Sequence, residues 1–474
     1  MAKQNILYGE WMPDQPGVTG AVTDAFNCYP VTNGYAPFKL EANYSNNAGQ
    51  TLLIVFAGKY GGATNLFAAG ATQVYKFDSS TTNLNALTTT GYTSTESWDV
   101  TQFGSKMIIA NGKNKLQAYD MSGGTYFSDL AAAAPVCKYV TVVRDFVVAA
   151  DDGSNNNKVY WSDINNETNW TPSSTSQSDY QILPDGGDIT GLTGGEYGLV
   201  FMERAIYRMS YVGSPLFFQF DAISRTLGCS TNGSIAQFGG ITYFLSDDGF
   251  YACDGQTVKG IGAEKVNRWF FDNAIPSEIR ISMSATVDPV RKLIAWNFKN
   301  SFGGRYLLFY SIDLGRWSYA ETTATSIAYG LTPSATLEQV DNYNNNLDTL
   351  DIPLDSRVWA GGILLFMGVT DQKIVSFSGQ NKSASIVSGD IDIGRSVITF
   401  ARPMIDNGSG TISIASRDLL SDNVIFGDAV SPDSEGRVAL RNAGRYHRVK
   451  MSPTSASWKT AIGTELEIVS QGNR

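Results

Sequence analysis

Asp151–Asn157 (DDGSNNN) carries side-chain oxygens at alternate positions, a spacing that is typical of a calcium-binding loop. The bidentate Glu that completes such a loop is missing at the required distance, so the sequence favours a plain hairpin turn. His447 is the only histidine, and it lies in an alternating stretch with no nucleophile motif nearby, which predicts a structural histidine. Because neither zinc-ligand spacing nor a GxxxxGK[ST] phosphate loop occurs, we expect no metal and no cofactor.

Glycoside hydrolysis requires two suitably spaced carboxylates, or a tyrosine nucleophile with its acid. Asp and Glu are scattered along this chain and no pair can be singled out, so no catalytic residue is assigned and we expect a protein that is not an enzyme. Ser311–Trp317 (SIDLGRW) resembles the Asp-box of sialidase-type propellers, and Ser162-Asp163 leading to Trp170 resembles it more loosely. In those propellers the Asp-box is a turn between outer strands and is not catalytic, so this resemblance supports an architecture.

The composition favours a large all-β protein. The chain has 474 residues, 43% hydrophobic and 12% aromatic, with 47 glycines, which suits many short strands joined by tight turns. Its net charge of −10 excludes a whole-protein footprint for wrapping DNA. An acidic surface could instead keep DNA from adhering in a channel, or it could serve only solubility; both interpretations stay open.

The chain carries no signal for export or for membrane insertion. No apolar run approaches the roughly 20 residues needed to span a bilayer, and residues 1–20 do not form a signal peptide. The four cysteines lie far apart without CxxC pairing, so we expect them reduced and buried in a chain that folds in the cytoplasm.

The structural unit that must organise these residues is the hairpin, and Gly239–Asp254 (GGITYFLSDDGFYACD) shows it most clearly. Apolar alternation on both sides of Asp-Asp-Gly predicts strand, tight turn, strand. The unit repeats: successive copies end at Asp78, Asp120, Asp163, Met209 and Asp254, which gives consecutive differences of 42, 43, 46 and 45 residues. A period of about 40–50 residues with four strands per repeat predicts a β-propeller. Seven hairpin copies predict six to seven blades over residues 41–384.

Two later spacings are longer and imply insertions. One insertion is Ala263–Arg280, where Val266, Trp269 and Phe270 would share one helical face. The other is Thr332–Pro353, which is rich in Asn and Asp and is predicted to be a surface loop.

The two ends of the chain differ from the repeats. Residues 1–40 predict an extended arm with Trp11, Tyr29 and Tyr35 as anchors, packed on the C-terminal domain, on a neighbouring subunit, or simply on its own subunit. Residues 385–474 alternate well and predict a small β-sandwich or barrel, which we term the platform. Its segment 437–459 carries six basic residues and no acid. The strand around Arg445 and Arg448 could therefore face an acidic partner or DNA, although a solvated strand face is the more common case.

Several short motifs resemble one family. Gly9–Pro16 (GEWMPDQP) with the proline-containing stretches to Phe38, Ala285–Asn297 (ATVDPVRKLIAWN), Tyr310–Trp317 and Gly444–Lys450 (GRYHRVK) resemble the tail nozzle, tail hub or packaged-DNA-stabilisation proteins of short-tailed bacteriophages. This resemblance implies a structural virion protein, folded in the host cytoplasm and forming a homohexameric ring below the head-to-tail adaptor. Genomic DNA would pass through the lumen without sequence-specific binding and be retained there until ejection. Tail fibres or tailspikes would attach laterally.

Two alternatives remain open. The chain could be a carbohydrate-binding or glycan-degrading propeller of a phage tail, with an aromatic shelf and acids at the propeller's central mouth, or a generic propeller scaffold. A closed ring with an open axial channel would favour the nozzle, and a sugar site would favour the first alternative.

Overall fold

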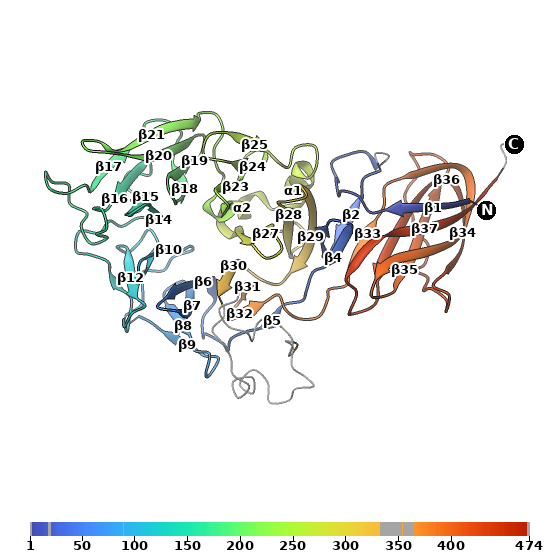
Figure 1. The fold of residues 1–474 in the computed structure, drawn as a ribbon, viewed down its shortest axis with the longest axis horizontal. Helices are drawn as coiled ribbons and strands as arrows, with labels where there is room; N and C mark the ends of the chain where they lie inside the picture. The colour runs from blue at the N-terminus through green and yellow to red at the C-terminus, as the bar shows by residue number, and fades with distance from the viewer. Residues whose placement is uncertain (1, 18–19, 89, 332–352, 354–363, 472–474) are drawn as a thin grey trace.

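The computed structural model describes residues 2–17, 20–88, 90–331, 353 and 364–471 and consists mainly of β-strands. Figure 1 shows an elongated molecule with a ring of small sheets at one end and a bent sheet of long strands at the other. The predicted all-β class, a propeller of six to seven blades with a smaller β domain, is confirmed. The predicted surface loop at 332–352 lies outside the described residues.

Six separate four-stranded antiparallel sheets form blades around the ring. The first blade contains β6 (Leu52–Tyr60), β7 (Ala63–Gly70), β8 (Val74–Phe77) and β9 (Leu84–Ala86), and the second contains β10 (Asp99–Phe103), β11 (Lys106–Ala110), β12 (Gln117–Asp120) and β13 (Ser128–Asp129). The third contains β14 (Tyr139–Val143), β15 (Phe146–Ala150), β16 (Lys158–Trp161) and β17 (Asp179–Ile182), and the fourth contains β18 (Ile189–Thr193), β19 (Gly198–Met202), β20 (Ile206–Gly213) and β21 (Phe217–Ser224). The fifth contains β22 (Ala236–Phe238), β23 (Ile241–Ser246), β24 (Gly249–Cys253) and β25 (Val258–Gly260).

The last blade closes the ring with a strand from the N-terminal part of the chain. It consists of β30 (Ser326–Leu331), β31 (Leu364–Thr370), β32 (Lys373–Ser376) and β5 (Ala42–Asn43). β30 packs beside β6 of the first blade, so the first strands of the blades follow one another around the axis. A further four-stranded unit lies between the fifth and last blades and is also one end of a 13-stranded sheet. It consists of β26 (Ser284–Asp288), β27 (Leu293–Lys299), β28 (Arg305–Ser311) and β29 (Arg316–Thr322).

The aspartate that ends several sequence repeats closes the turn after the third strand of a blade. The carboxylates of Asp78, Asp120 and Asp254 accept the backbone N–H two residues further on, at 2.9, 2.9 and 2.8 Å. Such Asx turns satisfy backbone donors that would otherwise have no partner. The pKa of each carboxyl is lowered, first by the hydroxyl of Ser80 for Asp78, by the hydroxyl of Ser122 for Asp120 and by the Thr257 N–H for Asp254, and then by these backbone hydrogen bonds. The aspartate that recurs at the end of the sequence repeats is therefore a signal for the turn after the third strand.

The apolar core of the propeller lies between adjacent blades. Phe67 and Ile109 belong to one such layer, Ile108 and Val147 to the next, and both layers are almost fully buried. The insertion before β26 contains α1 (Asn267–Asn273) and α2 (Pro276–Ser282). As predicted, Val266 and Phe270 point into the core, and Trp269 packs against it. Among the described residues, no helix is long and apolar enough to cross a membrane.

The platform is a strongly bent antiparallel sheet whose strands fold around a shared apolar core. It contains β33 (Ser385–Val387), β34 (Ile391–Asp406), β35 (Gly410–Arg417), β36 (Val438–Pro453) and β37 (Thr460–Ser470). The N-terminal segment adds β1 (Ala2–Leu7), β2 (Asp24–Phe26), β3 (Cys28–Val31) and β4 (Gly34–Pro37). The four cysteines of the chain are free and buried, as the sequence predicts.

Candidate functional site: the junction and the platform surface

The propeller and the platform are parts of one continuous hydrogen-bonded sheet. Strand β2 pairs in parallel with β29 of the propeller and antiparallel with β33 of the platform. On the propeller side Phe26 is opposite Tyr319, and the N–H of Asn27 donates to the Tyr319 carbonyl at 2.8 Å. β2 and β4 lie between the two parts of the molecule in Figure 1. The arm is therefore the connecting strand between the two parts.

Trp11 and Tyr35 anchor this arm inside its own chain, which is one of the placements that the sequence left open, and their buried side chains offer no surface to a neighbouring subunit. Trp11 is 1% exposed, stacks on Tyr319 with a centroid distance of 5.0 Å and meets Trp269 edge-on at 4.9 Å. Tyr35 is fully buried and donates its hydroxyl hydrogen to the Gly9 carbonyl at 2.9 Å. Burial costs the phenolate its hydration, so the pKa of Tyr35 is raised well above its ordinary value.

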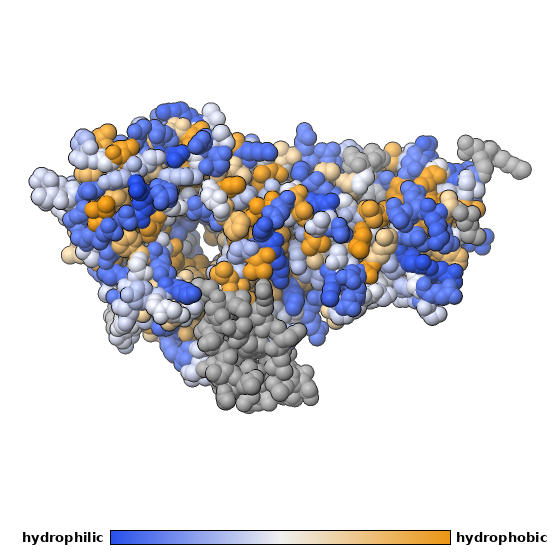
Figure 2. All heavy atoms as spheres, viewed as in Figure 1, coloured by the Kyte–Doolittle hydropathy of each residue, from blue (hydrophilic) through white to orange (hydrophobic). Residues whose placement is uncertain are grey.

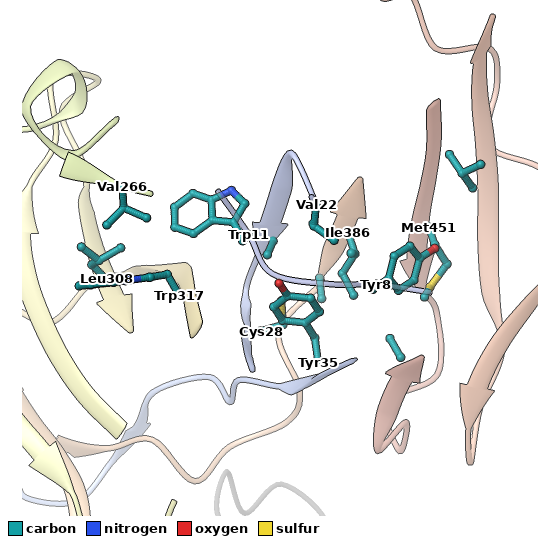
Figure 3. Close-up of a cluster of buried hydrophobic side chains, with 14 of the residues drawn as sticks. Tyr8, Trp11, Val22, Cys28, Tyr35, Val266, Leu308, Trp317, Ile386 and Met451 are labelled. Carbon is teal, nitrogen blue, oxygen red and sulfur yellow. The ribbon is translucent and has the colours of Figure 1, made fainter. Parts of the chain in front are cut away.

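The close-up of this core shows how the arm fills the junction. In Figure 3, Trp11, Tyr35 and Tyr8 lie between Val266 and Trp317 of the propeller and Met451 of the platform. These side chains belong to a single apolar cluster that runs through both parts of the molecule. The aromatic residues are buried here because the junction offers apolar surface on two sides, which the local sequence pattern could not show.

Tyr29, the third predicted anchor, is only half-buried. The guanidinium of Arg291 lies 5.2 Å from the centroid of its ring, within the range of a cation–π contact. Arg291 also donates to Asp288 at 2.9 Å. Tyr29 therefore has a partner within its own chain, and only the exposed part of its side chain is available for contact with another molecule.

Arg448, one of the two predicted basic interface residues, is neutralised inside the platform. Its guanidinium forms a bidentate hydrogen-bonded ion pair with the carboxylate of Asp390, with both N–O distances 2.8 Å. Arg417 donates to the same carboxylate at 2.7 Å. The Asp390 side chain is 3% exposed. Burial acts to raise the pKa of Asp390, but the hydrogen bonds and charges of Arg448 and Arg417 outweigh it and hold that pKa below the usual range.

Arg445 remains at the surface but is also paired. Its guanidinium contacts Asp392 at 3.1 and 3.3 Å, and both side chains are about half exposed. Arg437 pairs with Asp433 and Glu435 in the same way. The acids come from neighbouring strands and loops, and they pair three of the six basic residues of this segment, namely Arg437, Arg445 and Arg448. Ion pairing within the chain therefore reduces the positive charge that the segment can offer to DNA.

His447 is a structural residue, as predicted. It is fully buried, and its Nε2 lies 3.1 Å from the Gly444 carbonyl while its Nδ1 lies 2.7 Å from the Ser416 hydroxyl. These distances assign the proton to Nε2, with Ser416 donating to Nδ1. Burial lowers the pKa of His447, which keeps the ring neutral. No carboxylate of the described residues is hydrogen-bonded to the ring, so it is not arranged as a triad base.

The other two chemical motifs serve turns. In the loop Asp151–Asn157, Asp152 accepts the N–H groups of Ser154 and Asn155 at 2.8 and 2.6 Å and the hydroxyl of Tyr160 at 2.6 Å. The described residues contain no group of three or more His, Cys, Asp or Glu that could hold a metal ion. Ser311–Trp317 forms the turn between the outer strands β28 and β29, where Asp313 pairs with Lys292 at 2.9 Å.

The wall of the propeller axis has a shallow, mostly apolar hollow of about 380 Å³. It is lined by residues of the fifth blade, of the β26–β29 unit and of the last blade, among them Phe238, Val287, Pro289 and Tyr329. The space-filling view in Figure 2 shows an opening in the middle of the ring of blades. No carboxylate is among the residues that line this hollow, so it lacks the acids expected of a glycan-cleaving mouth.

Sequence reasoning missed the residues that receive the arm. Tyr319 donates its hydroxyl hydrogen to Asp24 at 2.8 Å, and the Ser385 hydroxyl donates to the same carboxylate at 3.1 Å. Burial raises the pKa of Asp24, and these hydrogen bonds only partly offset it. Asp24 is 295 positions from Tyr319 and 361 from Ser385, so no local pattern could have joined it to them.

No known family matches the sequence, and no curated protein matches it. Among the solved structures that align with it, three have sequence identities of 7–10%. BamB from Moraxella catarrhalis is 10% identical and covers 79% of this chain and 97% of its own, with a TM-score of 0.37. U3-55K is 7% identical, covering 70% and 97%, with a TM-score of 0.40. The RRP9 WD40 repeats are 7% identical, covering 73% and 99%, with a TM-score of 0.42. The likeness is one of fold.

Proposed function

We propose that this chain is a structural protein of a short-tailed phage virion, in which six copies form a ring-shaped tail nozzle below the head-to-tail adaptor. The ring would enclose the DNA exit channel and retain the packaged genome until ejection. The observation that supports this most is the continuous sheet β29–β2–β33, which joins propeller and platform through the arm. The motif resemblance of the sequence points to the same function.

Rigidity is what the proposed ring requires of its subunit. Domains joined by a small polar interface move relative to each other by default. Here the two parts share backbone hydrogen bonds and an apolar cluster containing Trp11, Trp317 and Met451. A ring built of such subunits would keep a channel of constant width, because each subunit resists bending at its centre.

The charge distribution agrees with DNA passing without binding. The chain carries a net charge of −10, and two cations of the basic strand of the platform, Arg448 and Arg445, are ion-paired with Asp390 and Asp392. Phosphate contacts supply most non-specific affinity for DNA, so a surface with few free cations lets the polymer slide. Adaptor, fibres or tailspikes would bind to outer surfaces of the ring. In this proposal the chain is not an enzyme.

A glycan-binding propeller is the second candidate, and the feature that bears on it is the pair Tyr160 and Tyr180. The two rings lie side by side on β16 and β17, with centroids 6.0 Å apart, and Tyr180 is 46% exposed. The Lys158 ammonium, however, lies over both rings at 4.3 and 3.8 Å, where a sugar would have to stack. This surface therefore favours the first candidate.

Electron cryo-microscopy of the phage tail that carries this chain tests the proposal. The expected result is a closed ring of six copies around a lumen wide enough for duplex DNA. A single propeller at the periphery of the tail, or a strictly monomeric copy inside assembled virions, would contradict it. Binding of the chain to glycans, screened in parallel, would then support the second candidate.

A further inference from the structure

The platform displays a rigid apolar turn immediately after β35. The Nη1 of Arg417 donates hydrogen bonds to the Leu420 carbonyl at 2.9 Å and to the Asp422 carbonyl at 2.8 Å. Its Nη2 donates to the carboxylate of the buried Asp390. The carboxylate of Asp422 accepts the N–H of Leu419 at 3.0 Å. Backbone and side-chain hydrogen bonds thus fix the turn from Leu419 to Asp422 without using its leucine side chains.

Those leucines point into solvent. Leu419 is 62% and Leu420 45% exposed, and Ile425 further along the same loop is 77% exposed. We call these three residues the leucine tip. Exposed apolar side chains on a turn that is already ordered lose little conformational entropy on docking, so they are suited to anchor a protein contact.

A groove whose lining is part apolar and part polar lies at the opposite end of β35. It is lined by the β3–β4 turn at Val31–Asn33, by the end of β34 at Met404–Asp406 and by Thr460 and Ile462 of β37, and its volume is about 600 Å³. We call it the junction groove. Gly34 closes its turn at a φ of +128°, and a Cβ there would lie 2.1 Å from the Ala461 carbonyl oxygen, so the turn is seated firmly against β37.

The placement of tip and groove is head to tail. The groove residue Asp406 precedes β35 by four positions and Leu419 follows its last residue by two, so the eight residues of β35 separate them by roughly 26 Å. Two complementary patches at opposite ends of one subunit form heterologous contacts, and such contacts close into rings when the rotation between copies allows it.

Charged side chains lie near both the tip and the groove. Asp418 beside the tip is 60% exposed, and its nearest cation, Arg395, lies 3.9 Å away at the surface. Lys459 at the rim of the groove is exposed, its backbone N–H donates to the Asp406 carbonyl at 3.0 Å, and its ammonium has no ion pair among the described residues. Asp418 and the free ammonium of Lys459 are opposite in charge, but Arg395 already pairs with Asp418 and the groove also carries the exposed Asp406, so the charge contribution comes from the single pair Asp418–Lys459.

We propose that the leucine tip of one copy docks into the junction groove of the next copy around the ring, with Asp418 facing Lys459 of that copy. This inference rests on the proposed ring function and specifies its subunit contact. It makes the platform, and not the propeller, the part that sets the order of subunits.

Cross-linking tests the contact directly. Leu420→Cys and Thr32→Cys chains with different tags are co-expressed and oxidised; the native cysteines are buried, so the new thiols are the accessible ones. The expected product is a disulfide-linked dimer that carries both tags, and neither variant alone should give it. Phe302→Cys, 79% exposed on the propeller, replaces Thr32→Cys as the matched control and should not cross-link.

Each result decides a different point. A Leu420→Cys dimer formed without the second variant would show a symmetric contact and overturn the inference. A ring without the mixed cross-link would overturn the inference and leave the nozzle function standing. A strictly monomeric free chain, by light scattering, would also overturn the inference, while the symmetry of the virion tail still tests the function.

A charge exchange provides the second measurement. Asp418→Lys should weaken self-association at least tenfold, and combining it with Lys459→Asp should restore most of the loss. Equal self-association of all three proteins, measured by analytical ultracentrifugation, would contradict the proposed pairing of these two residues.

Discussion

At the scale of single residues, buried carboxylates determine how the stability of this protein responds to pH. Asp99 at the start of β10 accepts the N–H of Val140 in the next blade at 2.9 Å, and so links two adjacent innermost strands. Burial raises the pKa of Asp99 to about 6, against the opposing effect of the hydrogen bonds from Val140 and Val100. The folded chain therefore holds this proton at pH values where the unfolded chain has released it.

Asp99→Asn should reveal this linkage. The wild type loses stability relative to the variant as the pH rises from about 4 to about 6, because the folded state binds more protons there. Thermal unfolding of both proteins at pH 4.5 and pH 7 measures the difference. Asp120→Asn is the control, since hydrogen bonds lower the pKa of Asp120 and its contribution is constant over this range. An unchanged difference between wild type and Asp99→Asn would contradict the raised pKa.

The pH dependence of stability has the opposite sign at Asp390. Its lowered pKa contributes stability that is present above the ordinary carboxyl pKa and is lost as the pH falls through the folded value. Asp390→Asn should cost about 3 kcal/mol of unfolding free energy at pH 7, because two guanidinium groups lose their buried counter-ion. Asp392→Asn, whose pair with Arg445 is exposed, should have little effect. Equal effects of the two variants in denaturant titrations would contradict the buried network.

At the scale of elements, the arm is the part on which the junction depends. Trp11→Ala should lower the unfolding free energy by about 3–5 kcal/mol, because the indole is 1% exposed and contacts both Trp269 and Tyr319. Leu7→Ala on the same arm, where the side chain is 62% exposed, is the matched control and should be nearly neutral. Calorimetry measures both. A Trp11 variant of normal stability that fails only to self-associate would instead restore the intersubunit interpretation.

At the scale of the whole molecule, the platform is not complete within residues 385–474. β1 pairs with β37, and β2 pairs with β33, so both sheet neighbours come from the first 26 residues of the chain. A fragment 385–474 should therefore lack dispersed amide signals in NMR spectra. Fusing residues 1–40 to it through a flexible linker should restore dispersion. A folded isolated fragment would show that the platform is independent of the arm.

The sequence alone determined the features that depend on nearest neighbours along the chain. The hairpin predicted at Gly239–Asp254 forms as β23 and β24, with Ser246 opposite Gly249 across the Asp-Asp turn. The repeat spacing predicted the first five blades because each of them is a local meander whose strands pair in chain order, whereas the last blade takes β5 from the N-terminal part of the chain. His447 could be assigned a structural role because no chemical partner accompanied it in the sequence.

Only the tertiary structure decided which surfaces are available. The sequence leaves open whether Trp11 and Tyr35 pack on their own subunit or on a neighbouring one, and in the structure they are buried by residues about 300–450 positions further along the chain, including Tyr319 and Ala461. The basic strand around Arg448 meets Asp390, which is 58 positions away. Local periodicity specifies strands and turns, whereas burial and charge pairing depend on long-range contacts that a single sequence does not encode locally. The leucine tip and the junction groove become visible for the same reason only once the platform is folded.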